Sequence, residues 1–161
     1  MDKAKLIEEI QQAFSSGQYP SDAAIVLDSP YAKIYPDYEG NTIAKVFKGK
    51  KWQEIDPDAL ARQNAAPGFL TQEAFHYYLP AYMMLMIQYI DKADVLVEIV
   101  INKLTPLSEN ELGESFIKAD LFTKEQGACI KHFLQYLQDA NPDFFENKEP
   151  TIAIERYWKN F

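Results

Sequence analysis

The chain is poor in the residues from which most catalytic sites are built. It has one cysteine, Cys129, two histidines and six glycines among 161 residues. The single cysteine excludes an intramolecular disulfide, and so few glycines leave little material for a phosphate-binding loop. The sequence also lacks a nucleophile elbow and the HExxH and CxxC motifs. The balance therefore favours a protein that is not an enzyme, and we expect no cofactor.

Positive charge is also scarce. The formal net charge is −8, and acidic side chains outnumber basic ones by 11 to 8 in residues 1–80 and by 13 to 8 in residues 81–161. Such a surface repels phosphate backbones, which nucleic-acid-binding proteins neutralise with clustered Lys and Arg. The one local exception, "KVFKGKK", is interpreted as a helix end whose lysines face solvent and the terminal carbonyls. We expect no nucleic-acid partner.

The longest apolar run, Ala74–Ile90, is too short and too polar for a membrane span. A spanning helix needs about 20 largely apolar residues, whereas this run contains Pro80, one His, one Gln and four Tyr. Its flanks, Glu73 and Asp91, carry no positive cluster that would orient a span. The N-terminus "MDKAKLIEEI" is charged and lacks the apolar core of a signal peptide. We therefore expect no membrane association and a cytoplasmic location.

The same run is predicted to form a buried central helix. "FLTQEAF" places Thr71 as the N-cap residue and spaces Leu70 and Phe75 as a hydrophobic staple. Apolar residues then follow helical spacing on every side, which is typical of a helix buried among other elements. Pro80 lacks an N–H, and its ring opposes the carbonyl of residue 76, so we expect this helix to be bent or split at Pro80.

The remaining pattern predicts an all-α fold. Helices are expected from Asp2 to Ser16, around Ile43–Phe47, from Asp56, over 94–104, over 121–138 with a Thr123–Gln126 capping box, and over 151–161. A strand remains the alternative for 92–104, which is rich in β-branched residues, and for 41–55. Residues 18–37 contain three prolines and are expected to be an irregular connector. The prediction is one compact domain, residues 1–161, of about six helices around the buried central helix.

Four segments carry a resemblance to a known family. "KGKKWQEI", "FLTQEAFHYYLPAYM", "LFTKEQGACIKHFLQYL" and the terminal "YW" resemble a family of small, helical bacterial proteins of unknown function, which has YYLPAYM-like and LFTKEQ…FLQYL-like segments. The resemblance spans roughly residues 38–158 and leaves the N-terminal helix outside. It implies the helical fold and transfers no site.

One spacing suggests a metal site. Glu73 and His76 form an E-x-x-H pair, the unit that helical di-iron sites use twice. Cys129 and His132 share a face of a later helix. If the two helices packed side by side, Glu73, His76, Cys129 and His132 could hold a zinc ion. The competing interpretation is structural, because a second E-x-x-H is missing and a lone cysteine is usually a small buried hydrophobe.

Two functions remain open on the sequence. The leading hypothesis is a non-enzymatic, acidic interaction module, adaptor-like or immunity-like, whose protein partner has a basic surface. The alternative is a small-ligand-binding or metal-binding protein, or an enzyme, with a site at the Pro80 bend formed by His76, Tyr78 and Tyr82. Buried tyrosines more often place the ring in the core and find a backbone partner for the hydroxyl. Homodimerisation through the terminal aromatic helix is compatible with either hypothesis.

Overall fold

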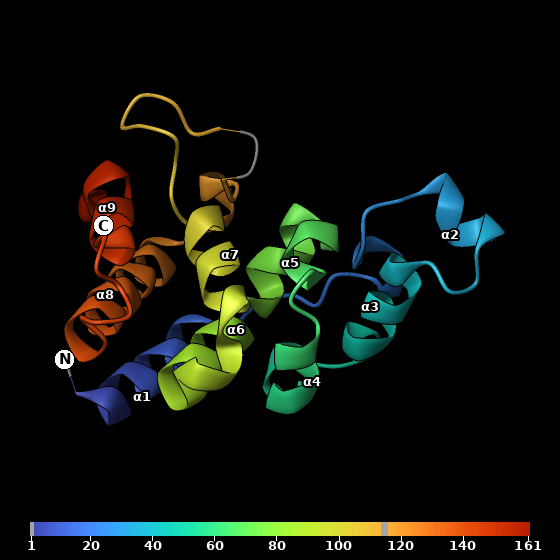
Figure 1. Ribbon diagram of the computed structural model, residues 1–161, viewed down its shortest axis with the longest axis horizontal. Coiled ribbons are helices and arrows are strands. Elements are labelled where there is room, and N and C mark those ends of the chain that lie inside the picture. Colours follow the sequence, from blue (N-terminus) through green and yellow to red (C-terminus); the bar gives the residue numbers. More distant parts are fainter. Residues whose placement is uncertain (1, 114–115) are drawn as a thin grey trace.

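The computed structural model describes residues 2–113 and 116–161 (Figure 1). Within these residues the chain forms nine α-helices and four short 3₁₀ helices, and its only β-type pairs are two isolated bridges. The elements are α1 (Lys3–Ala13), η1 (Asp22–Ala24), α2 (Pro30–Ile34), α3 (Glu39–Phe47), η2 (Trp52–Glu54), α4 (Pro57–Arg62), α5 (Ala66–Phe69), α6 (Gln72–Ala93), α7 (Val95–Lys103), η3 (Ala119–Leu121), α8 (Lys124–Ala140), α9 (Glu149–Arg156) and η4 (Trp158–Asn160). Helices α1, α3, α6, α7, α8 and α9 have at least 8 residues. The predicted all-α domain of about six helices is confirmed.

Side-chain caps determine where several helices begin. The side chains of Asp2, Asp56 and Thr71 each accept a hydrogen bond from a backbone N–H in the first turn of α1, α4 and α6. At α8, Thr123 and Gln126 form the predicted capping box: each side chain accepts from the other residue's backbone N–H, at 3.2 and 3.1 Å. Such bonds satisfy donors that a helix start leaves open and contribute about 1 kcal/mol each.

Helix α6 forms the centre of the domain. It contacts α1, α4, α7 and α8, and Figure 1 shows it between the side formed by α8 and α9 and the side formed by α3, α4 and α5. Phe75, Ala81 and Ile87 point in three directions spread around the helix axis, and all three are buried. The prediction of a buried central helix is therefore confirmed. No helix in the described part of the chain is long and apolar enough to cross a membrane.

The interruption of α6 lies at Tyr89 and not at Pro80. Helix α6 continues through Pro80, and the residue with non-helical dihedral angles is Tyr89, with φ −146° and ψ 55°. A proline removes one intrahelical hydrogen bond, but Pro80 and its neighbours Leu79 and Ala81 are all buried in the core. Packing on every side maintains the helix there, because helical stability in proteins comes mostly from tertiary contacts. The prediction of a split at Pro80 is therefore wrong, because the interruption lies at Tyr89, whereas the alternative of a bend at Pro80 stays a prediction.

A single residue, Asp94, separates α6 from α7. Its φ of 35° and ψ of −118° lie outside the regions that L residues ordinarily adopt. Helix α7 confirms the helix expected over 94–104, because Leu96, Val97, Val100 and Ile101 bury a helical stripe. The side chain of Asp94, however, makes no capping hydrogen bond. The stretch 41–55 is also helical, as α3 followed by η2.

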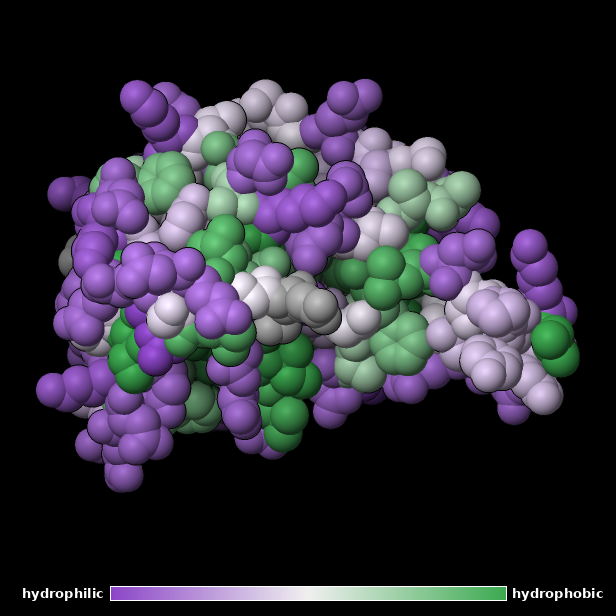
Figure 2. Space-filling model, turned by 90° about the horizontal axis from the view of Figure 1, so that it is seen from above, coloured by the Kyte–Doolittle hydropathy of each residue, from purple (hydrophilic) through white to green (hydrophobic). Residues whose placement is uncertain are grey.

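Residues 18–37 are largely irregular, as predicted, apart from η1 and the short helix α2. The backbone of this connector is anchored on α5 and α6: the Leu27 N–H donates to the Phe69 carbonyl at 2.8 Å, and the Thr71 N–H donates to the Ile25 carbonyl at 3.0 Å. Figure 2 shows the α2 end as a narrow extension of the molecule. Apolar side chains are exposed along it, at Leu27, Tyr31, Ile34 and Tyr35.

The last aromatic residues dock on the domain. Trp158 is fully buried, and its Nε1–H donates to the Leu104 carbonyl at 2.7 Å, so η4 is tied to the end of α7. The ring of Phe161 lies directly against the backbone of Gly127 in α8, where any added Cβ would collide with it. The close approach of α8 to the C-terminal ring therefore requires glycine at position 127.

Candidate functional site

Tyr78, one of the predicted ligand-binding residues, is a structural tie inside the core. It is fully buried, and its single O–H is shared between the carbonyl oxygens of Phe47 and Lys50, each 2.9 Å from the hydroxyl oxygen. Burial is the main reason that the pKa of Tyr78 is raised above its usual range. Because Phe47 is the last residue of α3, this hydroxyl fastens the end of α3 to the middle of α6.

Tyr82 is equally buried but makes no such tie. Its hydroxyl has no hydrogen-bond partner in the described part of the chain, and burial raises the pKa of Tyr82. Its ring packs at 5.9 Å from the ring of Phe75. Neither tyrosine exposes its hydroxyl, so a ligand could reach them only if the surrounding core moved.

His76 takes part in a partly buried polar connection. Its Nε2 lies 3.1 Å from Oε1 of Gln126, and its ring packs edge-on against Phe122, with centroids 4.7 Å apart. Burial lowers the pKa of His76, and the hydrogen bond to Gln126 opposes that effect. The amide of Gln126 also donates to the Ala13 carbonyl at 3.3 Å. His76 and Gln126 therefore join α6, α8 and the end of α1.

The predicted metal-ligand set is not assembled. His76 is bound to Gln126, while Nδ1 of His132 lies 2.8 Å from a carboxylate oxygen of Glu9 in α1. Cys129 is buried, which raises its pKa to about 12, and Glu73 is exposed. No group of three or more His, Cys, Asp or Glu side chains among the described residues could hold a metal ion. Helices α6 and α8 do pack together, but His132 is bound to Glu9 of α1 and His76 to Gln126, the capping-box residue of α8.

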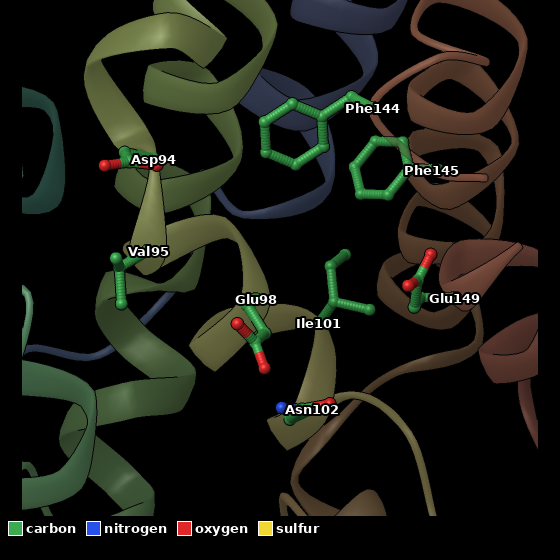
Figure 3. Close-up of a pocket in the computed structure, with 8 residues that line it drawn as sticks. All are labelled: Asp94, Val95, Glu98, Ile101, Asn102, Phe144, Phe145 and Glu149. Atoms are coloured by element: carbon green, nitrogen blue, oxygen red, sulfur yellow. The ribbon is translucent and has the colours of Figure 1, made fainter. Parts of the chain in front are cut away.

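A pocket of about 270 Å³ lies between α7, the connector 141–148 and the start of α9 (Figure 3). We call it the α7–α9 pocket. Its lining combines carboxylates, one amide and apolar side chains: Asp94, Val95, Glu98, Ile101, Asn102, Phe144, Phe145 and Glu149. Val95 and Phe144 are 50% and 47% exposed, so the pocket opens beside apolar surface.

The acidic groups lie on opposite walls of this pocket. In Figure 3, Glu149 lies on the α9 side and Glu98 on the α7 side, with Ile101 between them. The two phenylalanine rings lie together at one end, with centroids 4.9 Å apart in an edge-on arrangement. The carboxylate of Asp94 is turned away from these rings, so the backbone at the α6–α7 junction forms this part of the rim.

Glu149 has one occupied and one unoccupied carboxylate oxygen. Oε1 accepts a hydrogen bond from the side-chain amide of Asn147 at 3.3 Å. Oε2 is buried and has no partner in the described part of the chain. A buried oxygen without a donor is unfavourable by about 1–3 kcal/mol, so this atom favours any ligand that brings a donor.

The surroundings of the pocket are strongly acidic. The segments 91–98 and 139–149 contain seven carboxylates, Asp91, Asp94, Glu98, Asp139, Asp143, Glu146 and Glu149, and two lysines, Lys92 and Lys148. Lys92 is engaged elsewhere, at 2.9 Å from Asp58 of α4. Among the described residues, no ion pair involves Asp94, Glu98 or Glu149. The pocket therefore presents uncompensated negative charge.

Two unusual backbone conformations border the same pocket. Asp94 and Lys148 are the non-glycine residues with positive φ in the described ranges, at 35° and 60°. Asp94 lines the pocket, and Lys148 immediately precedes Glu149. Non-glycine residues in such conformations cost about 1–3 kcal/mol and cluster at functional sites.

Sequence reasoning missed this pocket. Its local signals are weak: an aromatic pair inside the acidic stretch "NPDFFENKE", and an aspartate at a helix junction. Neither signal shows that residues 144–149 lie against α7, because that arrangement depends on the packing of α9 on α7 and α8.

The fold and this site together define an acidic, all-α domain with an open anionic pocket. The chain belongs to a family of unknown function, DUF6714, whose model matches residues 2–161. The match includes the N-terminal helix, which the resemblance noted in the sequence left outside. No curated protein and no solved structure matches the chain.

Proposed function

We propose that this protein is a non-enzymatic interaction module of the bacterial cytoplasm that binds a basic surface of a protein partner, as adaptor and immunity proteins do. The observation that carries the proposal is the α7–α9 pocket. Its carboxylates Glu98 and Glu149 have no cationic partner in the described part of the chain, and they lie beside the exposed side chains of Val95 and Phe144.

This combination matches the usual anatomy of a protein interface. Interface centres are enriched in aromatic residues and surrounded by a polar rim, and Phe144 beside two carboxylates reproduces that arrangement on a small scale. The net charge of −8 adds a long-range contribution, because complementary charge speeds association and selects among partners.

The two other binding surfaces that the sequence suggests are less suited to binding. Tyr78 and Tyr82 are fully buried, so the interior site would require the core to open. Trp158 fills the protein's own core, which removes the main apolar residue of the proposed dimer contact through the terminal helix.

The proposal is tested by native mass spectrometry of the tagged protein purified from its source cells. We expect a second polypeptide in stoichiometric amount, and its loss from a Glu98→Gln/Glu149→Gln double variant. A Glu8→Gln/Glu155→Gln variant is the matched control, because it removes the same charge from two exposed positions outside the pocket.

The identified partner should also bind with an on-rate that falls steeply as salt is raised from about 0.05 to 0.5 M, since screening shortens the range of charge attraction. A protein that emerges bare from the cells, or a partner whose on-rate ignores salt, would contradict the proposal. Retention of the partner by the double variant would exclude the α7–α9 pocket as the contact.

A further inference from the structure

We infer that the α7–α9 pocket receives an arginine side chain of the partner, with the guanidinium between Glu98 and Glu149. This inference rests on the proposed function and identifies the chemical group that the site recognises. The pocket volume of about 270 Å³ lies just below the roughly 300–1,000 Å³ of typical small-molecule sites. It therefore suits one inserted side chain better than a whole metabolite.

The acceptors of the pocket match a guanidinium group. Glu98 and Glu149 supply carboxylate oxygens from opposite walls, and Asn102 supplies an amide oxygen on the α7 side. Arginine carries five N–H donors in a planar fork and no acceptor, so it can bond to groups on both walls at once. A lysine ammonium has three donors on one atom and is more strongly hydrated, which makes it the weaker match.

Glu149 has one carboxylate oxygen that this contact would satisfy. The hydrogen bond from Asn147 holds Oε1, while Oε2 remains buried without a partner. A guanidinium N–H would satisfy this oxygen and form a charge-assisted hydrogen bond, which is roughly twice as strong as a neutral one. Because Oε2 is buried, a guanidinium N–H can reach it only when the Glu149 side chain or its neighbours move, while Asn147 holds the other oxygen.

The apolar part of the pocket suits the rest of the arginine side chain. Phe144 and Phe145 lie together at one end, and Ile101 separates the two carboxylates. Guanidinium groups stack on aromatic faces, and the methylene stem of arginine packs on apolar surface while its head remains polar. Among the described residues, no cationic side chain forms an ion pair with Glu98 or Glu149. An incoming arginine therefore does not have to displace one.

The inference is tested on the full chain by NMR titration of backbone amides with N-acetyl-arginine methylamide at constant ionic strength. We expect saturable shifts confined to α7 and residues 142–149, with a Kd on the order of 1–10 mM, the range of a single anchored side chain. The citrulline analogue has the same shape without the charge, and we expect it to bind at least tenfold more weakly. The lysine analogue should be intermediate.

Glu149→Gln should weaken arginine binding at least fivefold, whereas Glu8→Gln should leave it unchanged, and the amide spectra report directly whether each variant is folded. Equal binding of citrulline, shifts scattered over the acidic surface, or an unchanged Kd in Glu149→Gln would overturn the inference. Loss of the arginine site with a partner still captured from cells leaves the interaction module standing with another contact. Arginine binding by a protein that captures no partner from cells would support the arginine site and contradict the interaction module. The failure of each proposal can therefore be told from the failure of the other.

Discussion

The two halves of α6 differ in how regular their helical backbone is. The first half, from the Thr71 cap through Tyr82, contains Pro80, which the sequence predicts as a break, yet it forms an uninterrupted helix. The second half has no unusual residue in its sequence, yet it is interrupted at Tyr89 and ends in the positive φ of Asp94. The α7–α9 pocket lies at this second end.

The difference shows that packing determines where a helix loses its regular geometry. Pro80 is buried on all sides, so the surrounding core compensates for its missing hydrogen bond. Tyr89 is 44% exposed and has fewer neighbours that could maintain a helical conformation. Local deviation from helical geometry is therefore tolerated at the surface and suppressed in the core.

The largest expected effect concerns the two buried tyrosines. Tyr78→Phe removes the hydroxyl that bonds to the carbonyls of Phe47 and Lys50, and among the described residues only the Phe47 carbonyl keeps another donor, the Lys50 N–H at 3.0 Å. We expect the substitution to lower the free energy of unfolding by about 1–3 kcal/mol. Tyr82→Phe removes a hydroxyl that has no partner, and we expect it to raise the free energy of unfolding by about 1 kcal/mol. Urea unfolding of both variants measures the difference, and equal responses would show that the two hydroxyls are not distinguished by their bonds.

A smaller effect is expected at the junction of α6 and α7. Asp94→Gly should raise the free energy of unfolding by about 1 kcal/mol, because glycine adopts the φ of 35° without the steric cost of a Cβ. Asp91→Gly is the matched control inside α6, and it should lower the free energy of unfolding by about 1 kcal/mol. If both glycines destabilise the protein alike, the junction stores no strain.

The smallest effect is the pH dependence that His76 contributes to stability. Burial lowers its pKa in the folded protein, so below about pH 6.5, the ordinary value, the unfolded chain binds a proton that the folded chain resists. Stability from this group is therefore present above that pH and is lost as the pH falls toward the lowered pKa. We expect the Tm of the protein to fall more between pH 7 and pH 5.5 than the Tm of His76→Gln, and identical slopes would refute this assignment.

Local signals made much of the fold predictable. Thr71 and the Thr123–Gln126 capping box predict where α6 and α8 begin, because a helix cap depends on residues only a few positions apart. The helical stripe of α7 outweighed its β-branched residues, since four of its apolar side chains meet the core at helical spacing. These features needed no knowledge of distant contacts.

The site was not predictable, because it depends on distant contacts. The spacing within each helix suggests a metal site at the two histidines, with a structural role as the alternative. In the structure His132 lies against Glu9 of α1 and His76 against Gln126 of α8. The α7–α9 pocket likewise requires Glu149 to face Glu98 across two separate elements. Periodicity along one helix carries no information on such pairs.

The packing of α1 on α8 also has a consequence for the timing of biosynthesis. The Gln126 amide meets the Ala13 carbonyl across 113 residues of sequence. At roughly 5–20 residues per second, a ribosome needs about 6 to 23 s to make the intervening chain. During that interval Leu6, Ile10 and Phe14, all buried in the finished protein, have no α8 to cover them. The nascent chain therefore exposes the apolar face of an amphipathic helix to chaperones before the α7–α9 pocket has formed.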